Sequence, residues 1–329
     1  MKLAYYPGCS AKGSSLDYEL SSQAVCKVLG IQAEEIKDWN CCGSTPAHAV
    51  STELSAALCT RNLSLAAKQG ADTVVTPCPS CLSNLLHARQ RMENPEFRDR
   101  VNGLLDEPAP EKLPETISVM QCIGRMRDAD AIRKHVTSTL AGIKIAPYYG
   151  CLMSRPPELM NFGDPENPSL MESLLAACGA DSILDFPLKT ECCGASSGIP
   201  HRPLTARNSG RILELAVRMG ADCVAVCCPL CQMNLDLRQK QAAKAKADKA
   251  RAQANAKANA AKKAKQDKLD ALALRERELK VRLAELKVQE REAQVGTSVA
   301  EEAVRTEKAR EKVELELERT RAEIKKLDQ

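Results

Sequence analysis

The sequence lacks long apolar runs. It contains no stretch of about 18 apolar residues, the length that spans a membrane, and its first residues include no apolar segment long enough for a secretory signal. We therefore expect a protein of the cytoplasm without a membrane span. In that reducing compartment, clustered cysteines are more often metal ligands or redox groups than structural disulfides.

Residues 239–329 lack cysteine, proline and aromatic residues, and they are rich in Ala, Lys and Glu. This composition predicts a charged helical or partly disordered tail. Its lysines could attract phosphate, but the absence of stacking aromatics makes nucleic-acid binding an unfavourable interpretation. Two apolar clusters are compatible either with a solvated helix or with a helix that pairs with itself or a partner. They are Leu272, Leu279, Leu283 and Leu286, and then Val313, Leu317, Ile324 and Leu327.

Cysteine is abundant, with 16 residues in a chain that is too long for a small disulfide-stabilised scaffold. Ten of these cysteines form two similar sets, each with a Gly-Cys, a Cys-Cys-Gly and a Cys-Pro-x-Cys segment. The first thiol group comprises Cys9, Cys41, Cys42, Cys78 and Cys81. The second thiol group comprises Cys151, Cys192, Cys193, Cys228 and Cys231.

The segments between the cysteines are also repeated. In each half a short β-type run leads to the first cysteine, helical stretches follow, and a β-branched run leads to the Cys-Pro-x-Cys segment. This alternation predicts an α/β protein with two pseudo-symmetric domains, small and mostly parallel sheets, and a C-terminal charged α-helical extension. The expected divisions are a first domain (1–103), a Pro-containing linker with a bridging helix (104–141), a second domain (142–238) and the tail (239–329).

Thiolates are soft ligands that select iron–sulfur clusters, zinc or Cu(I). A tetrahedral zinc site closes with four ligands, so a fifth thiolate is expected if one sulfur bridges two irons of a cluster. Alternatively, one cysteine of each vicinal pair is a free reactive thiol. Zinc in one of the sites, and buried cysteines without a ligand role, are the other interpretations. The remaining cysteines are expected to be small buried residues; they are Cys26, Cys59, Cys122, Cys178, Cys223 and Cys227.

Both sets of motifs resemble the tandem CCG domains of the B subunit family of heterodisulfide reductase, over about residues 1–238. The segment around Cys151, with Arg155-Pro156-Pro157-Glu158, is also similar to that family. The resemblance implies a noncubane [4Fe–4S] cluster at each thiol group, two in all, facing one another across a cleft in which a disulfide is reduced. Methanogen members carry His after the cysteine equivalent to Cys151, where this chain has Leu152.

The same resemblance implies partner subunits. A ferredoxin-like C subunit with cubane clusters would deliver the electrons, and a flavin-containing A subunit would supply that C subunit. This chain has neither a C-x2-C-x2-C-x3-C-P run nor a glycine-rich dinucleotide motif of its own. The alternatives are a CCG electron-transfer subunit of another dehydrogenase, of the lactate or thiol:fumarate type, and a zinc-binding assembly subunit.

Four further residues are candidates for the site. His201 and His48 follow the Cys-Cys-Gly segments and could donate a proton, or could be surface or capping residues. Arg155 and Arg202 could bind an anionic group of a substrate, or could form ordinary ion pairs.

Overall fold

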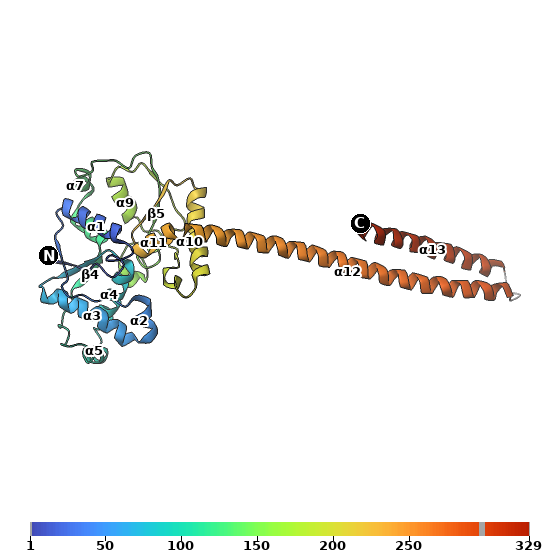
Figure 1. Ribbon diagram of the computed structural model, residues 1–329, viewed down its shortest axis with the longest axis horizontal. Coiled ribbons are helices and arrows are strands. Elements are labelled where there is room, and N and C mark those ends of the chain that lie inside the picture. The colour runs from blue at the N-terminus through green and yellow to red at the C-terminus, as the bar shows by residue number, and fades with distance from the viewer. Residues whose placement is uncertain (1, 296–299, 329) are drawn as a thin grey trace. The chain divides into compact units, whose positions relative to one another are not determined.

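The computed structural model describes residues 2–295 and 300–328, and the chain divides into two compact units, Met1–Lys246 and Ala247–Gln329. The first unit is the α/β body and the second is a helical hairpin (Figure 1). The predicted fold class is confirmed, because small parallel sheets and surrounding helices precede a helical C-terminal region.

The first sheet has the order β2-β1-β3-β4, and all its strands are parallel. The strands are β1 (Leu3–Tyr5), β2 (Ala33–Glu35), β3 (Thr73–Thr76) and β4 (Glu115–Ser118). The central strands are buried on both faces, as their apolar and β-branched residues predict. Strand β4 lies within the segment predicted as a linker, so that segment extends the first sheet.

The second sheet repeats this arrangement with three parallel strands in the order β6-β5-β7. They are β5 (Lys144–Tyr148), β6 (Ser182–Ile183) and β7 (Cys223–Val226). The order β6-β5-β7 corresponds to β2-β1-β3, which gives the body its pseudo-symmetry.

Helices cover the sheets and connect their strands. Those of the first half and the connecting segment are α1 (Leu16–Val28), α2 (Ser44–Val50), α3 (Thr52–Lys68), α4 (Pro79–Arg91), α5 (Pro95–Asn102), α6 (Val119–Met126) and α7 (Ala129–Arg133). Those of the second half are α8 (Pro157–Met160), α9 (Leu170–Ala177), the 3-10 turn η1 (Ala195–Ser197), α10 (Arg202–Arg218) and α11 (Pro229–Leu237).

The two halves of the body share a hydrophobic core. Leu82 and Leu86 of α4 are packed with Tyr149 and Met153 of the second half, and all four side chains are buried. Gln121 of α6 donates its side-chain amide to the carbonyl of Met160, at 3.3 Å. The halves therefore form one packed structure, and the equivalent loops of the two halves are held in fixed positions relative to one another.

The tail consists of α12 (Gln239–Val295) and α13 (Ala300–Asp328). In the second unit, Leu279 and Leu286 of α12 and Leu317 of α13 are buried. Ion pairs join the two helices, including Arg275–Glu316 at 2.7 Å and Lys268–Glu323 at 2.9 Å. Leu279 and Leu286, which are spaced by seven, thus pack within the chain, so of the two alternatives that the sequence left open the structure shows a paired helix.

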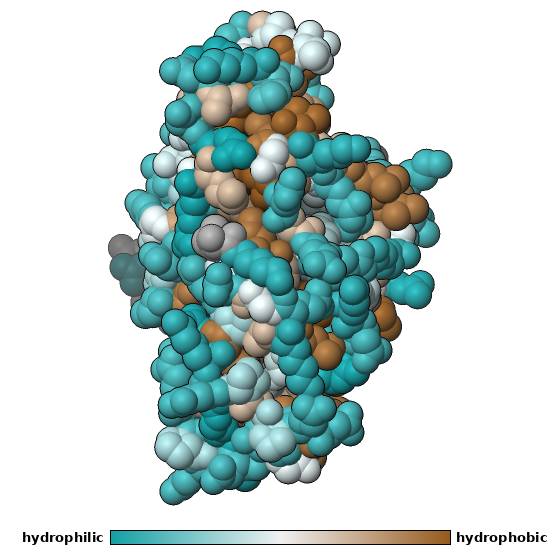
Figure 2. All heavy atoms as spheres, turned by 90° about the vertical axis from the view of Figure 1, so that its left-hand side faces the viewer, coloured by the Kyte–Doolittle hydropathy of each residue, from teal (hydrophilic) through white to brown (hydrophobic). Residues whose placement is uncertain are grey.

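The surface drawn in Figure 2 is mostly hydrophilic, with separate hydrophobic patches. Among the residues that the structure describes, no helix combines the length and the apolarity required to cross a membrane.

Candidate functional site

The cysteines lie where the strands of each sheet end. Cys9 follows β1, Cys41 and Cys42 follow β2, and Cys78 follows β3 as the N-cap residue of α4. The C-terminal ends of parallel strands meet at one edge of a sheet, and ligands of open α/β sheets bind outside that edge. The second half has the same arrangement, with its cysteines after β5, β6 and β7.

The first thiol group is assembled in the fold. The Sγ atoms of Cys9 and Cys41 are 3.7 Å apart, and those of Cys42 and Cys81 are 3.5 Å apart. Cys42, Cys78 and Cys81 are buried, whereas Cys9 and Cys41 are exposed. The group therefore extends from the core to the surface.

The second thiol group has equivalent contacts. The Sγ atoms of Cys193 and Cys231 are 3.4 Å apart, and the backbone N–H of Gly194 donates to the sulfur of Cys192 at 3.3 Å. Cys193, Cys228 and Cys231 are buried, Cys151 is half-buried and Cys192 is exposed. Four of the five pairs of corresponding cysteines thus share the same degree of burial, and only Cys151 is more buried than its counterpart Cys9.

The two thiol groups meet inside the body. They approach one another at Cys78 and Cys228, because the interaction with Cys228 is the largest of the effects that lower the pKa of Cys78 well below its usual range. Helix α1 joins the halves beside this contact, because Ser15 donates to the carbonyl of Pro229 at 3.2 Å and Gln232 donates to Asp17 at 2.8 Å.

Glycine is required directly before the first cysteine of each group. A Cβ atom at Gly8 would lie 2.9 Å from the Sγ of Cys81, and one at Gly150 would lie 3.0 Å from the Sγ of Cys231. Both glycines have positive φ values, +76° and +72°. They allow the backbone to approach the sulfur of the Cys-Pro-x-Cys turn, which a side chain would prevent.

A buried tyrosine supports each Cys-Cys segment. The hydroxyl of Tyr6 donates to the carbonyl of Asn40 at 2.8 Å, and that of Tyr148 donates to the carbonyl of Glu191 at 2.5 Å. Asn40 and Glu191 each precede a vicinal cysteine pair. Both rings are fully buried, so each one links the first strand of its half to the loop that follows the next strand.

Hydrogen bonds between the thiols favour the thiolate at selected cysteines. The thiols of Cys41 and Cys81 lower the pKa of Cys42 far below its ordinary value, against the opposing effect of burial. The Cys231 thiol lowers the pKa of Cys193 to about 7, also against burial. Thiolates are the form that binds metals, so each group is prepared for ligation.

Two asparagines that were not among the predicted site residues also contact the cysteines. Asn84 directs its side-chain N–H at the Sγ of Cys42, at 3.6 Å, and Asn234 does the same for Cys193, at 3.5 Å. The available signal was the repeated pattern Cys-Pro-x-Cys-x2-Asn, in which both asparagines lie on the same helical face as the last cysteine.

The other predicted site residues have less direct positions. His48 is exposed, and its Nε2 is hydrogen-bonded to the Oδ1 of Asn84 at 2.9 Å, so it reaches Cys42 only through that amide. His201 is exposed at the N-cap of α10, without a side-chain capping bond. Arg155 makes a two-point ion pair with Glu166, with both contacts at 2.6 Å. Arg202 is exposed in the first turn of α10.

The six cysteines outside the two groups are not uniformly buried. Cys59, Cys122 and Cys227 are buried, Cys26 and Cys178 are half-buried, and Cys223 is exposed. The expectation of a buried position is therefore wrong for Cys223, which begins the strand β7 near the surface. Cys227 is hydrogen-bonded to the carbonyl of Tyr149 at 3.5 Å, whereas Cys228 is packed in a core cluster with Cys193 and Cys231.

The donors that each thiol group supplies suit an iron–sulfur site. Across residues 2–295 and 300–328, no three His, Cys, Asp or Glu side chains are placed to hold one metal ion. Each group instead supplies five thiols, amide N–H donors and a glycine next to the Cys-Pro-x-Cys turn. Hydrogen bonds to sulfur and thiolate donors are features of iron–sulfur sites.

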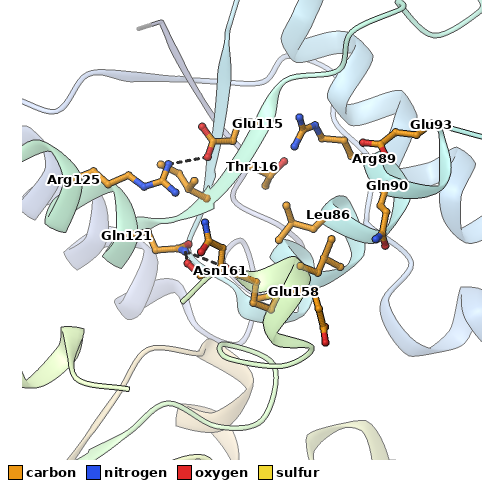
Figure 3. A pocket seen from close by; sticks show the side chains of 13 residues that line it. Leu86, Arg89, Gln90, Glu93, Glu115, Thr116, Gln121, Arg125, Glu158 and Asn161 are labelled. Carbon is orange, nitrogen blue, oxygen red and sulfur yellow. Dashed lines mark hydrogen bonds and ion pairs between the residues drawn. The ribbon is translucent and has the colours of Figure 1, made fainter. Parts of the chain in front are cut away.

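A separate cavity of about 300 Å³ lies between the C-terminal half of α4, β4, α6 and α8. Figure 3 shows Arg125 paired with Glu115, and Gln121 directed at Asn161, on one side of it. None of the cysteines contributes to its lining, and neither does Arg155 or Arg202. The cavity is therefore distinct from the thiol groups.

The chain is similar to curated proteins over most of its body. It is 29% identical over 243 residues to the 8-methylmenaquinol:fumarate reductase membrane anchor subunit of Wolinella succinogenes, covering 73% of this chain and 84% of that protein. It is 28% identical over 249 residues to the B subunit of a ferredoxin/F420H2-dependent CoB-CoM heterodisulfide reductase of Methanosarcina acetivorans, covering 72% and 80%. An Archaeoglobus profundus protein, named as similar to the B subunit of heterodisulfide reductase, is 27% identical, covering 73% and 83%.

A solved structure shares the fold. The crystal structure of a hypothetical protein from Helicobacter pylori superposes with a TM-score of 0.57 at 14% identity, and the match covers 74% of this chain and 44% of the solved chain. The family model for the cysteine-rich domain, CCG, matches residues 3–86 and 145–236, which are the two halves that carry the thiol groups. This chain therefore belongs to the CCG cysteine-rich domain family and contains two copies of the domain.

Proposed function

We propose that this protein is the disulfide-reducing, catalytic-type subunit of a heterodisulfide reductase-like complex, with one noncubane [4Fe–4S] cluster at each thiol group. The observation that carries the proposal is the approach of the two equivalent groups, at Cys78 and Cys228, inside one packed body. Relatives named as heterodisulfide reductase B subunits support the same assignment.

The pairing of the groups suits the chemistry of a disulfide. Cleavage of a disulfide to two thiols requires two electrons and two protons, and a pair of iron–sulfur clusters, when bound, supplies electrons one at a time. The contribution of this chain is to hold the ligands close together. The glycine before each first cysteine, the tyrosine under each Cys-Cys segment and the packed core between the halves all serve that purpose.

The electrons would come from partner subunits. A ferredoxin-like C subunit with cubane clusters, fed by a flavin-containing A subunit, is the arrangement we propose, because this chain has no motif for either cofactor. The relatives are themselves named as subunits of larger enzymes, which supports a multisubunit complex.

Metal analysis tests the proposal. After anaerobic reconstitution, iron and acid-labile sulfide should approach four of each per thiol group, and EPR should show two cluster signals. Cys42→Ala and Cys193→Ala should each remove one signal and abolish disulfide-dependent oxidation of a reduced viologen dye. The matched control is Cys223→Ala, because Cys223 is exposed and lies outside both groups. About one iron per group, or zinc in its place, would contradict the proposal.

A second function is favoured by one comparison. The fumarate reductase relative of Wolinella succinogenes supports a CCG electron-transfer subunit that serves another oxidoreductase and has no disulfide substrate of its own. The dye assay separates the two functions. Clusters that are reduced by the dye but are not reoxidised by any of a series of small and protein disulfides would favour this second function.

A further inference from the structure

The two asparagines that contact the thiol groups differ in the residue that is hydrogen-bonded to the oxygen of their side-chain amide. Asn84 and Asn234 occupy equivalent positions, three residues after the last cysteine of each group, and both are buried. Each donates its side-chain N–H to the buried sulfur of a vicinal pair, Cys42 or Cys193. The inference drawn from them rests on the proposed function, because it concerns the clusters that these cysteines would hold.

In the second half an arginine determines the orientation of the amide. The Nε of Arg238 donates to the Oδ1 of Asn234 at 2.8 Å, and an Nη of the same side chain donates to the carbonyl of Gly198 at 3.2 Å. A guanidinium can only donate hydrogen bonds, so it must face the oxygen of the amide. The N–H group of Asn234 is thereby left to face the sulfur of Cys193.

Arg238 also brings a positive charge to this side of the second site. The ion pairs formed within residues 2–295 and 300–328 do not include Arg238. By contrast, Arg61 near the first group is paired with Asp38 at 2.5 Å, and Arg155 near the second is paired with Glu166 at 2.6 Å. Arg238 is half-buried, which limits the screening of its charge by water.

In the first half the corresponding partner is a histidine. The Nε2 of His48 is 2.9 Å from the Oδ1 of Asn84 and 3.3 Å from the hydroxyl of Ser55. The His48 side chain is exposed, and it is an imidazole where the second half has a guanidinium. The amide of Asn84 therefore lacks the fixed cation that polarises the amide of Asn234.

We propose that Asn84 and Asn234 are positioning residues that raise the reduction potentials of the two sites, and that Arg238 raises the potential of the second site further. Hydrogen bonds to cysteine sulfur and positive charge stabilise the reduced, more negative state of an iron–sulfur site. A cation on the far side of an amide strengthens the hydrogen bond that its N–H donates. Arg238 consequently favours the residence of a delivered electron at the Cys193 site.

A redox titration of the reconstituted full-length protein, followed by EPR, tests this inference. Asn84→Leu should lower the midpoint potential of one signal and Asn234→Leu that of the other, which assigns the signals. Arg238→Gln should lower the midpoint potential of the Asn234-dependent signal only. The ratio of oxidised to reduced site at a fixed potential should change by about tenfold, which corresponds to about 59 mV for a one-electron couple. Arg238→Lys should restore part of the shift, because it keeps the charge.

The matched control is Arg218→Gln. Arg218 is exposed in the last turn of α10, and its replacement removes the same charge from the same half without touching Asn234. If Arg218→Gln and Arg238→Gln shift the second potential equally, or if neither shifts it, the role of Arg238 is refuted while the clusters stand. If no clusters form in the unmodified protein, the proposed function fails and this inference fails with it. Should Asn234→Leu not fold, the Arg238 variants still decide the question.

Discussion

Replacing Gly8 with alanine should disrupt the first thiol group, through two effects that can be separated. The backbone of Gly8 has φ +76°, and a new Cβ would lie 2.9 Å from the Sγ of Cys81. The left-handed conformation costs a residue with a Cβ about 1–2 kcal/mol. Overpacking a buried site adds about 1–3 kcal/mol. We therefore expect Gly8→Ala to lower the free energy of unfolding by about 2–5 kcal/mol, as the sum of these two effects.

Gly142→Ala is the control, because Gly142 has φ +80° but a Cβ there would meet no atom within 4 Å. Gly142→Ala should lower the free energy of unfolding only by the cost of the left-handed conformation, about 1–2 kcal/mol. Urea unfolding of the cluster-free proteins measures both values, and the iron content after reconstitution measures the effect on the site. Gly8→Ala should bind less iron than the control, since Cys81 must move. Equal stability losses combined with normal iron content in both variants would refute the reasoning.

Three further predictions concern the rest of the molecule. The Nζ of Lys189 is 2.8 Å from Glu172, and the side chain of Lys189 is only 9% exposed. Lys189→Met should therefore destabilise the body by about 3–5 kcal/mol, the cost of breaking a buried ion pair. An unchanged melting temperature would contradict this prediction. Leu279 is only 5% exposed, and removal of a buried leucine costs about 2–5 kcal/mol, so Leu279→Ala should make the hairpin more sensitive to proteolysis. Leu274 is 59% exposed, so Leu274→Ala should leave the sensitivity unchanged. Burial raises the pKa of Cys122 to about 11, so the folded state binds the thiol proton more tightly than the unfolded state. The free energy of unfolding should therefore fall as the pH rises from about 8.5, the pKa of a free thiol. Cys122→Ala should reduce this fall, and an identical pH dependence in the two proteins would count against the prediction.

Much of the candidate site could be predicted because its ligands lie close together along the chain or recur in a pattern. Cys78 and Cys81 are separated by one turn, and a β-branched run before them predicts the strand that places them at a sheet edge. The same pattern returns with Cys228 and Cys231, so the repeat itself indicated two equivalent groups. Strand β4 was missed because its four residues, Glu115–Ser118, lie within a proline-containing segment and show no distinct alternation.

By itself, the sequence predicted two thiol groups, the cysteines that form them and a parallel α/β fold whose strands carry them, since these features follow from spacing and local periodicity. Only the tertiary structure decided what the groups touch. Cys78 and Cys228 come close together from different halves. The amides of Asn84 and Asn234 donate hydrogen bonds to cysteine sulfur in loops that are distant in sequence, and Arg155 forms its ion pair with Glu166. Such contacts depend on how the two halves and their helices pack, and packing between distant segments leaves no periodic signal in a single sequence.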